Sequence, residues 1–216
     1  MKEKLLEIYQ KLYRAFGPQY WWPADSDFEV AVGAILTQNT SWSNVEKAIE
    51  NLKRSRCLSF TKMRRLSEKK LAQLIRPAGY YNIKAKRLKI FFEFLWKNYR
   101  GSLKRMRLKE TCALRTELLS VCGIGPETAD SILLYALGKP IFVVDTYTRR
   151  IMSRHDVIKA SYDYHDIQKV FMGHLRHDAR IFNEYHALLV KCAKDFCKKH
   201  KMNCSTCPIN HRGGHD

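Results

Sequence analysis

The segment ELLSVCGIGPETAD, residues 117–130, decides the fold, because it predicts two helices joined by a tight Gly-x-Gly hairpin. Gly123 and Gly125 permit unusual backbone dihedrals and allow a ligand to come close to the chain. Pro126 suits the first turn of the second helix, where its missing N–H leaves no hydrogen bond unmade. Exposed N–H groups at such a helix start can hold a phosphate. The segment therefore predicts a helix-hairpin-helix element that contacts a phosphate.

The charge of the chain points to an anionic polymer as its partner. The 216 residues include 39 lysines and arginines against 21 aspartates and glutamates, a net charge of +18. Such a surface gains affinity for nucleic acid, because each phosphate that it neutralises releases counterions. No apolar run reaches the ~20 residues of a membrane span, and the first residues lack the apolar core of a signal peptide. We therefore expect an intracellular, nucleic-acid-binding protein without a membrane segment.

The hydrophobic pattern predicts an all-α protein. Apolar residues recur at helical spacing, and the alternation typical of strands is nearly absent. The segment 140–144 is strand-like but too short to define a sheet. Ser26 or Asp25 is the expected N-cap of the second helix. The predicted helices cover residues 5–13, 27–36, 43–52, 67–75, 82–98, 111–121, 127–137, 146–153, 164–174 and 181–194.

The hairpin, followed by the Gly/Pro-containing segment that leads to Asp145, resembles the endonuclease III-like (HhH-GPD) superfamily of DNA glycosylases. The resemblance extends over almost the whole chain. It implies a two-lobed helix-hairpin-helix glycosylase fold, with a central lobe at 24–135 and a second lobe formed by 1–23 and 136–216. It also implies double-stranded DNA as the partner, a cytoplasmic, nucleoid-associated monomer, and a bound monovalent cation at the hairpin.

Asp145 is the catalytic carboxylate that this resemblance implies. It follows an apolar segment, so partial burial can tune its pKa. Its role would be to stabilise an oxocarbenium-like sugar and to orient or deprotonate the attacking water. The residues after it, Thr-Tyr-Thr-Arg-Arg, equally suit a helix with Asp145 as its N-cap. Both roles can hold at once.

Glu127 departs from the pattern of the bifunctional members, which carry a nucleophilic lysine directly after the hairpin. A lysine amine can attack the sugar and form a Schiff base, whereas a carboxylate cannot. The departure implies a monofunctional enzyme that releases a base and leaves an abasic site. Lys139 is the obvious alternative nucleophile, although a solvated surface lysine is the simpler interpretation.

Three residues match the base pocket of the 3-methyladenine DNA glycosylase III branch, which the chain resembles in its Trp-Trp-Pro and Leu-Thr-Gln-Asn-Thr elements. In that branch an aromatic sandwich holds the base, and Trp22, Pro23 and Trp42 match its positions, with Trp42 in place of a phenylalanine. Aromatic faces stack on a flipped base. A methylated purine is cationic, so an indole adds a cation–π attraction of about 1–2 kcal/mol. The alternative is that these tryptophans only fill space between the lobes.

Further residues match the DNA-contacting positions of the superfamily. Gln38 matches a glutamine that fills the gap left by the flipped nucleotide, and Tyr80 matches a second wedge on the opposite strand. Such wedges offset part of the cost of unstacking. Lys84 is a candidate phosphate contact, together with Lys86, Arg87, Arg149 and Arg150, although a solvated charged face explains any one of them equally well.

The C-terminal cysteines match part of the [4Fe–4S] loop of endonuclease III relatives. Cys197, Cys204 and Cys207 have the spacing of the first three ligands, but Gly213 stands where the fourth cysteine is expected. Thiolates are the usual ligands of such clusters, and four is the usual number. The remaining cysteines, Cys57, Cys112 and Cys122, are expected to be buried free thiols.

Several residues could supply the missing ligand. Cys192 lies on the preceding helix, and His211 or His215 offers an imidazole. A structural zinc bound by three thiolates and one histidine is the alternative to the cluster. Members of the 3-methyladenine glycosylase III branch generally lack a cluster, so the chain combines features of two branches.

The sequence thus predicts a monofunctional DNA glycosylase of base excision repair, with an alkylated purine such as 3-methyladenine as the favoured substrate. One alternative is a glycosylase of the same fold for oxidised pyrimidines, uracil or mismatched thymine. The other is a non-catalytic binder of DNA structure, since helix-hairpin-helix elements often only hold phosphate.

Overall fold

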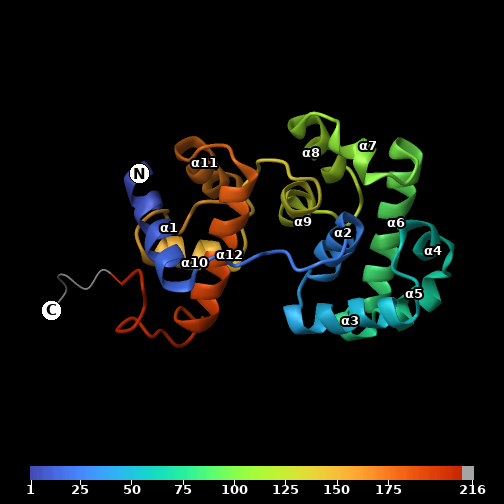
Figure 1. Ribbon diagram of the computed structural model, residues 1–216, viewed down its shortest axis with the longest axis horizontal. Helices are drawn as coiled ribbons and strands as arrows, with labels where there is room; N and C mark the ends of the chain where they lie inside the picture. Colours follow the sequence, from blue (N-terminus) through green and yellow to red (C-terminus); the bar gives the residue numbers. More distant parts are fainter. Residues whose placement is uncertain (211–216) are drawn as a thin grey trace. The chain divides into compact units, whose positions relative to one another are not determined.

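The computed structural model describes residues 1–210, and its regular secondary structure in that range is helical (Figure 1). The chain divides into two compact units. The terminal unit comprises Met1–Trp21 and Pro140–Asp216, and the central unit comprises Trp22–Lys139. The central lobe expected at 24–135 lies inside the central unit. The all-α fold class predicted from the hydrophobic pattern is confirmed.

The central unit contains the hairpin and most of the helices. Its elements are α2 (Asp27–Leu36), α3 (Trp42–Arg54), α4 (Phe60–Arg65), α5 (Glu68–Leu74), η1 (Arg76–Ala78), α6 (Tyr81–Tyr99), α7 (Leu103–Arg107), α8 (Thr111–Leu119), α9 (Pro126–Ser131) and η2 (Ile132–Ala136). Helices α4 and α7 were not predicted, because basic segments of 6 and 5 residues are too short to show a helical period.

Helix α2 is the core of the central unit. Every residue from Glu29 to Leu36 is buried, which an apolar helix tolerates when neighbours cover it on all sides. It packs against α3, α6, α9 and η2. Ser26 is the N-cap and its Oγ accepts a hydrogen bond from the Glu29 N–H at 3.2 Å, so one of the two predicted caps is confirmed.

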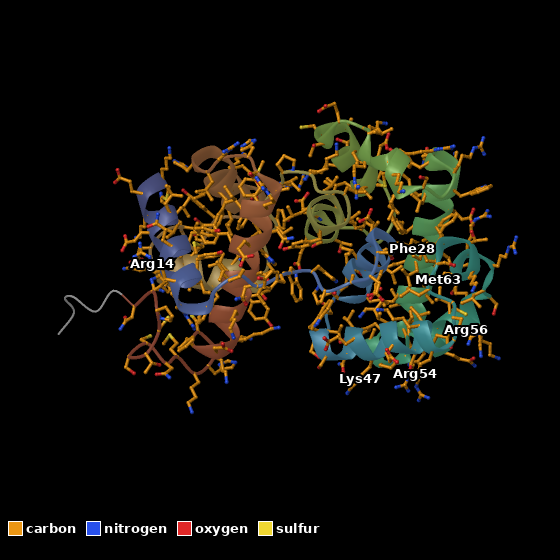
Figure 2. All side chains as sticks on the ribbon, in the orientation of Figure 1. Arg14, Phe28, Lys47, Arg54, Arg56 and Met63 are labelled. Atoms are coloured by element: carbon orange, nitrogen blue, oxygen red, sulfur yellow. The ribbon has the colours of Figure 1, made fainter. Side chains whose placement is uncertain are left out.

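Basic side chains cover the outside of the central unit. Lys47, Arg54 and Arg56 are exposed and point outward, whereas Met63 is buried (Figure 2). Cys112 and Cys122 are exposed as well and Cys57 is partly exposed, so the expectation that these three are buried thiols was wrong. The positions of Cys112 and Cys122 in a helix and a turn place them away from the core.

The terminal unit is built from α1 (Lys2–Phe16), α10 (Thr146–Arg154), α11 (Tyr164–His174) and α12 (Ala179–Asp195). Helix α12 packs on α1 and α10. In the core of the terminal unit, the rings of Phe142 and Phe171 stack with centroids 3.8 Å apart. The buried Tyr185 hydroxyl donates a hydrogen bond to the Leu5 carbonyl at 2.8 Å, which ties α12 to α1.

The strand-like segment 140–144 forms no strand. Its apolar side chains are buried, and its backbone is held by side chains rather than by a neighbouring strand. The Gln168 amide donates to the Phe142 carbonyl at 2.7 Å, and the Val144 N–H donates to the Tyr164 hydroxyl at 3.4 Å. This extended segment delivers Asp145 to the start of α10.

The helix after the hairpin changes its winding. It begins as α9 and continues as the π-helical turn η2, where a single α-helix over 127–137 was predicted. Such turns are frequent at functional sites and redirect the side chains that follow. Across residues 1–210, no helix combines the length and apolarity that crossing a membrane requires.

Candidate active site

The two helices of the hairpin are joined by a buried ion pair. The Arg115 guanidinium on α8 donates two hydrogen bonds to the Asp130 carboxylate on α9, at 2.7 and 3.0 Å. Asp130 is fully buried, so removing either partner would leave an uncompensated charge in the core. Pro126 is the first residue of α9, as predicted. The geometry of the hairpin is thus fixed by its own helices.

Of the two hairpin glycines, only Gly123 requires its residue type. Its φ is +87°, and an added Cβ would lie 2.5 Å from Cγ of Arg87. Gly125 has φ −91° and ψ 179°, which any residue adopts, so the prediction that both glycines have unusual dihedrals was wrong for Gly125. A Cβ at Gly125 would meet nothing within 4 Å, so this position leaves open space beside the backbone.

Gln38 is tied to the hairpin. Its Nε2 donates hydrogen bonds to the Gly123 carbonyl and the Thr128 hydroxyl, both at 2.9 Å. The Arg87 guanidinium donates to its Oε1. The side chain of Gln38 therefore couples the loop after α2 to the hairpin and to α6. As a wedge in DNA it would have to exchange these hydrogen bonds for new ones.

Tyr80 and Lys84 have opposite environments, although the sequence assigned both to DNA contacts. Tyr80 is 68% exposed and has φ +45°, a left-handed conformation that is strained for a tyrosine. Lys84 is 1% exposed, and its Nζ donates to the carbonyls of Leu36 at 2.8 Å and Ala78 at 2.6 Å. The prediction that Lys84 contacts phosphate was therefore wrong.

Lys84 instead holds two loops together. The Leu36 carbonyl lies two residues before Gln38, and the Ala78 carbonyl lies two residues before Tyr80. Burial, together with the nearby charge of Arg87, lowers the pKa of Lys84 to about 8.

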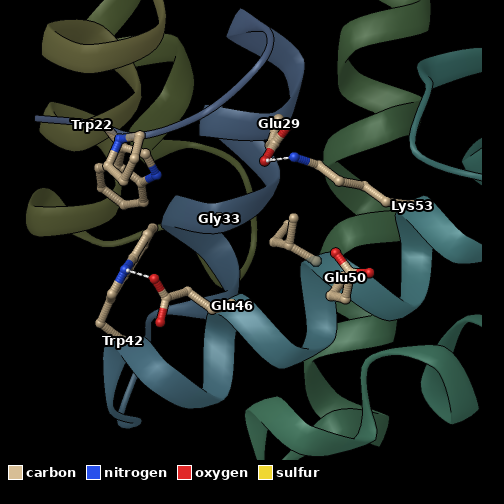
Figure 3. Close-up of a pocket in the computed structure, with 9 residues that line it drawn as sticks. Trp22, Glu29, Gly33, Trp42, Glu46, Glu50 and Lys53 are labelled. Atoms are coloured by element: carbon tan, nitrogen blue, oxygen red, sulfur yellow. Dashed lines mark hydrogen bonds and ion pairs between the residues drawn. The ribbon is translucent and has the colours of Figure 1, made fainter.

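The expected base-pocket residues line one pocket of the central unit (Figure 3). Its volume is about 200 Å³, and Trp22, Pro23 and Trp42 lie on its wall. The two indoles meet edge to face at 87°, with centroids 4.9 Å apart. Tyr135 supports Trp22 from η2, at a centroid distance of 5.3 Å. Gly33 makes room for Trp22, because a Cβ there would lie 3.1 Å from Cζ2 of the indole.

Three carboxylates, from Glu29, Glu46 and Glu50, also line this pocket. Glu29 is paired with Lys53 at 2.8 Å. Oε1 of Glu46 accepts a hydrogen bond from Nε1 of Trp42 at 2.8 Å (Figure 3). None of the three was predicted from the sequence, although the spacing of Trp42, Glu46 and Glu50 places them along one side of α3.

Asp145 is the N-cap of α10, so one of its two predicted roles is confirmed. Its Oδ1 accepts a hydrogen bond from the Thr148 N–H at 2.7 Å, and its Oδ2 lies 3.4 Å from Nε2 of His186 on α12. Burial alone would raise the pKa of Asp145, but the nearby His186 and the hydrogen bond from Thr148 hold it below its usual value.

His186 was not predicted as a site residue from the sequence. It is 6% exposed and lies among the apolar positions of α12. A histidine on a buried helical face is the only signal that the sequence offered, and such residues are common in protein cores. Its contact with Asp145 makes it part of the candidate site.

The C-terminal cysteines are partly gathered. Sγ of Cys192 lies 3.9 Å from Sγ of Cys207, and Arg154 donates a hydrogen bond to Sγ of Cys197 at 3.0 Å. A hydrogen bond from Cys192 lowers the pKa of Cys207 to about 6. Up to residue 210, however, no three cysteine, histidine or carboxylate side chains converge as a metal site.

The described cysteines are therefore not brought together as the ligands of a cluster. The position of the expected fourth cysteine, Gly213, lies outside the described residues, and so do the alternative ligands His211 and His215.

Residues 32–177 match the family described as HhH-GPD superfamily base excision DNA repair protein. The chain belongs to this family. A putative DNA repair glycosylase of Methanocaldococcus jannaschii is 51% identical over 215 residues, which cover 97% of each chain. The H. pylori 3-methyladenine DNA glycosylase bound to 1,N6-ethenoadenine is 31% identical, with a TM-score of 0.76 over 89% of this chain and 96% of its own.

A trapped endonuclease III–DNA covalent intermediate has the same fold, with a TM-score of 0.82 over 97% of this chain and 93% of its own, at 20% identity. The protein is thus a DNA repair glycosylase of the HhH-GPD superfamily and acts on DNA. The family match at 32–177 includes the hairpin, Gln38, Tyr80 and Asp145. The four C-terminal cysteines and the Trp22–Pro23 element lie outside it.

Proposed function

We propose that this HhH-GPD protein is a monofunctional glycosylase that hydrolyses the N-glycosidic bond of an alkylated purine, such as 3-methyladenine, in double-stranded DNA. The observation that carries the proposal is the pocket in which Trp22, Pro23 and Trp42 lie together with carboxylates. Indole faces attract a cationic base. The likeness to the H. pylori 3-methyladenine glycosylase supports the same substrate class.

Asp145 is the proposed catalytic residue. Its lowered pKa keeps it ionised at neutral pH. A carboxylate anion can stabilise the positive charge that develops on the sugar as the bond breaks, and can orient the attacking water. A cationic purine leaves as a neutral base, so little acid catalysis is required. The anion is held in place by Thr148 and His186.

The absence of lyase activity follows from Glu127. The position after the hairpin offers a carboxylate, which cannot form a Schiff base with the sugar. Lys139, the alternative nucleophile, donates a hydrogen bond from Nζ to the Lys109 carbonyl at 2.7 Å. We therefore expect an abasic site as the product, without strand cleavage.

DNA contacts in this proposal come from the hairpin and two wedges. Exposed amides around Gly125 face a backbone phosphate, with the monovalent cation that the family resemblance implies. Tyr80, exposed and held at the start of α6, enters the duplex together with Gln38. The enzyme acts as a monomer.

The C-terminal cysteines are proposed to bind a structural metal group, a [4Fe–4S] cluster in preference to zinc. Binding would gather the thiolates of Cys192, Cys197, Cys204 and Cys207, of which Cys192 and Cys207 already lie 3.9 Å apart. The group would anchor the loop that carries Lys198, Lys199 and Lys201, and no step of the reaction passes through it.

The test is base release from methylated duplex DNA by the wild-type protein and by Asp145→Asn, with strand breaks scored before and after alkali. We expect methylated purine to be released only by the wild type, with breaks only after alkali. No release from methylated DNA, but release of uracil, mismatched thymine or an oxidised pyrimidine, would overturn the substrate class. Breaks without alkali would overturn the monofunctional assignment. DNA binding without any base release would favour a non-catalytic binder.

A further inference from the structure

The three pocket carboxylates differ in how their charge is compensated. Glu29 pairs with Lys53 at 2.8 Å, and Glu50 pairs with Arg54 at 2.9 Å. Glu46 makes no ion pair with any residue in the described part of the chain. Its one described partner is the Trp42 indole N–H, at 2.8 Å (Figure 3). Glu46 therefore brings an uncompensated negative charge to an aromatic pocket.

Such a charge is unfavourable in a protein that binds a polyanion. The chain carries a net charge of +18, and a carboxylate near the DNA-binding region repels phosphate. Its position in the pocket makes sense if a cation enters there. From this arrangement we infer that Glu46 is a specificity-determining residue that selects a positively charged base over a neutral one, an inference that rests on the proposed function of the pocket.

Glu46 acts on the base in two ways. Its carboxylate, which is exposed at the pocket wall, attracts the positive charge of an N-alkylated purine directly, and a base bound over it would exclude water and strengthen the attraction. By accepting the indole N–H, it also fixes the orientation of Trp42 and adds electron density to the ring face. A more electron-rich indole binds a cation better. Both effects vanish for a neutral base of the same shape.

The selection acts on binding more than on bond breaking. The base carries its charge in the bound substrate and loses it as the N-glycosidic bond breaks, when the charge moves to the sugar. An interaction that is stronger in the ground state than in the transition state lowers KM without raising kcat. Removing the charge of Glu46 should therefore raise KM for a cationic base and leave kcat unchanged or higher.

The variant that isolates this effect is Glu46→Gln, whose amide oxygen still accepts the Trp42 N–H. Single-turnover release of 7-methylguanine and of 1,N6-ethenoadenine from duplex DNA compares a cationic with a neutral base. We expect the KM for 7-methylguanine to rise about tenfold, within the range of one desolvated cation–π contact, while release of the neutral base is unchanged. Equal changes for both bases, or none for 7-methylguanine, would overturn the inference.

The matched control is Glu93→Gln on α6, which makes the same change in net charge outside the pocket. Glu93 is 59% exposed in its side chain and paired with Arg64 at 3.0 Å. A general gain in DNA affinity would appear in both variants and for both bases. Only Glu46→Gln should change the ratio between the two bases.

A binding measurement separates this inference from the proposed function. Quenching of tryptophan fluorescence by 1-methyladenosine, a cation at neutral pH, is compared with quenching by adenosine. If the wild-type protein releases no base but binds 1-methyladenosine more tightly than adenosine, and Glu46→Gln loses this preference, the inference stands while the proposed function fails. A wild-type protein that binds both nucleosides equally overturns the inference whatever its activity.

Discussion

Oδ2 of Asp145 lies 3.4 Å from Nε2 of His186, and the two side chains are only 12% and 8% exposed. The pair joins the start of α10 to the middle of α12. An imidazole N–H that faces the carboxylate fixes its orientation and favours its ionised form. His186 is thus a positioning residue for the group that is proposed to act on the sugar.

Substituting His186 tests this relationship. We expect His186→Leu to reduce kcat for base release by about tenfold to a hundredfold, the range seen when a supporting partner of a functional ligand is removed. The pH profile should change as well, because the pKa of Asp145 rises without the nearby His186. His186→Gln retains a donor and should recover part of the activity. A variant with normal kcat and an unchanged pH profile would show that the contact is only structural.

The lowered pKa of Asp145 makes stability depend on pH. Its pKa in the folded state lies below the value of 3.8 that it has when unfolded. Its contribution to stability is therefore present above pH 3.8 and is lost as the pH falls through the folded-state pKa. Urea unfolding should show a steeper loss of stability on acidification for the wild type than for Asp145→Asn, which keeps an N-cap but has no charge to lose. Parallel curves for the two proteins would contradict this prediction.

Lys84 gives a second pH dependence of the same sign, in an alkaline range. Its pKa falls from 10.5 when unfolded to about 8 in the fold, so the unfolded chain binds the additional proton between these values. Stability should therefore rise with pH from about 8 to 10.5 through this group. In Lys84→Met the rise should disappear. The variant should also lose about 2–4 kcal/mol of unfolding free energy, because two carbonyls lose their donor.

The matched control for Lys84→Met is Lys86→Met, on the same helix but with an exposed side chain. We expect it to keep the wild-type stability to within about 0.5 kcal/mol. Equal stability of both variants would mean that Lys84 does not hold the loops that carry Gln38 and Tyr80.

Gly33 leaves the space that the Trp22 ring occupies, so Gly33→Ala should disturb the pocket. The added Cβ would meet the indole at 3.1 Å, and the ring must shift by a few tenths of an ångström. We expect a severalfold increase in KM for methylated DNA. Thermal unfolding should change little, since the helix propensity gained, about 1 kcal/mol, offsets the crowding. An unchanged KM would indicate that Trp22 does not touch the base.

The metal group proposed at the C-terminal cysteines predicts the metal content of the purified protein. Protein purified without oxygen should contain about four irons and four sulfides per chain, as expected for one [4Fe–4S] cluster. Cys207→Ser should lose them and unfold at a lower temperature, whereas the exposed Cys112→Ser should retain them. Zinc in place of iron would establish the alternative. Metal-free protein with the same unfolding temperature in a chelator would exclude both.

Local signals predicted much of the fold. The Gly-x-Gly-Pro segment predicted the turn and the start of α9, and the polar residues before helices predicted the caps at Ser26 and Asp145. These features depend on neighbours in sequence. The shared pocket wall of Trp22, Pro23 and Trp42 was reached only through resemblance to known relatives.

Features that depend on distant contacts were not predicted. The sequence shows several lysines on α6 but not that Lys84 points inward, because its partners are carbonyls from two separate loops. The contact of His186 with Asp145 joins residues 41 positions apart, and no local pattern marks it. The hydrogen bond from Trp42 to Glu46 is different, because it joins residues four positions apart on α3 and helical spacing alone could have indicated it.

The π-helical turn η2 supports Trp22, a wall residue of the pocket, and this support depends on how many residues the turn contains. Tyr135 reaches Trp22 from within this turn. Deleting a single residue from 132–134 would let the segment rewind as an α-helix and rotate Tyr135 by about 100° around the axis. Conservative substitutions there would leave the wall in place. The pocket is thus sensitive to the deletion of one residue in the turn that supports Trp22. Its shape can therefore change in evolution by insertion or deletion of residues as well as by substitution of side chains.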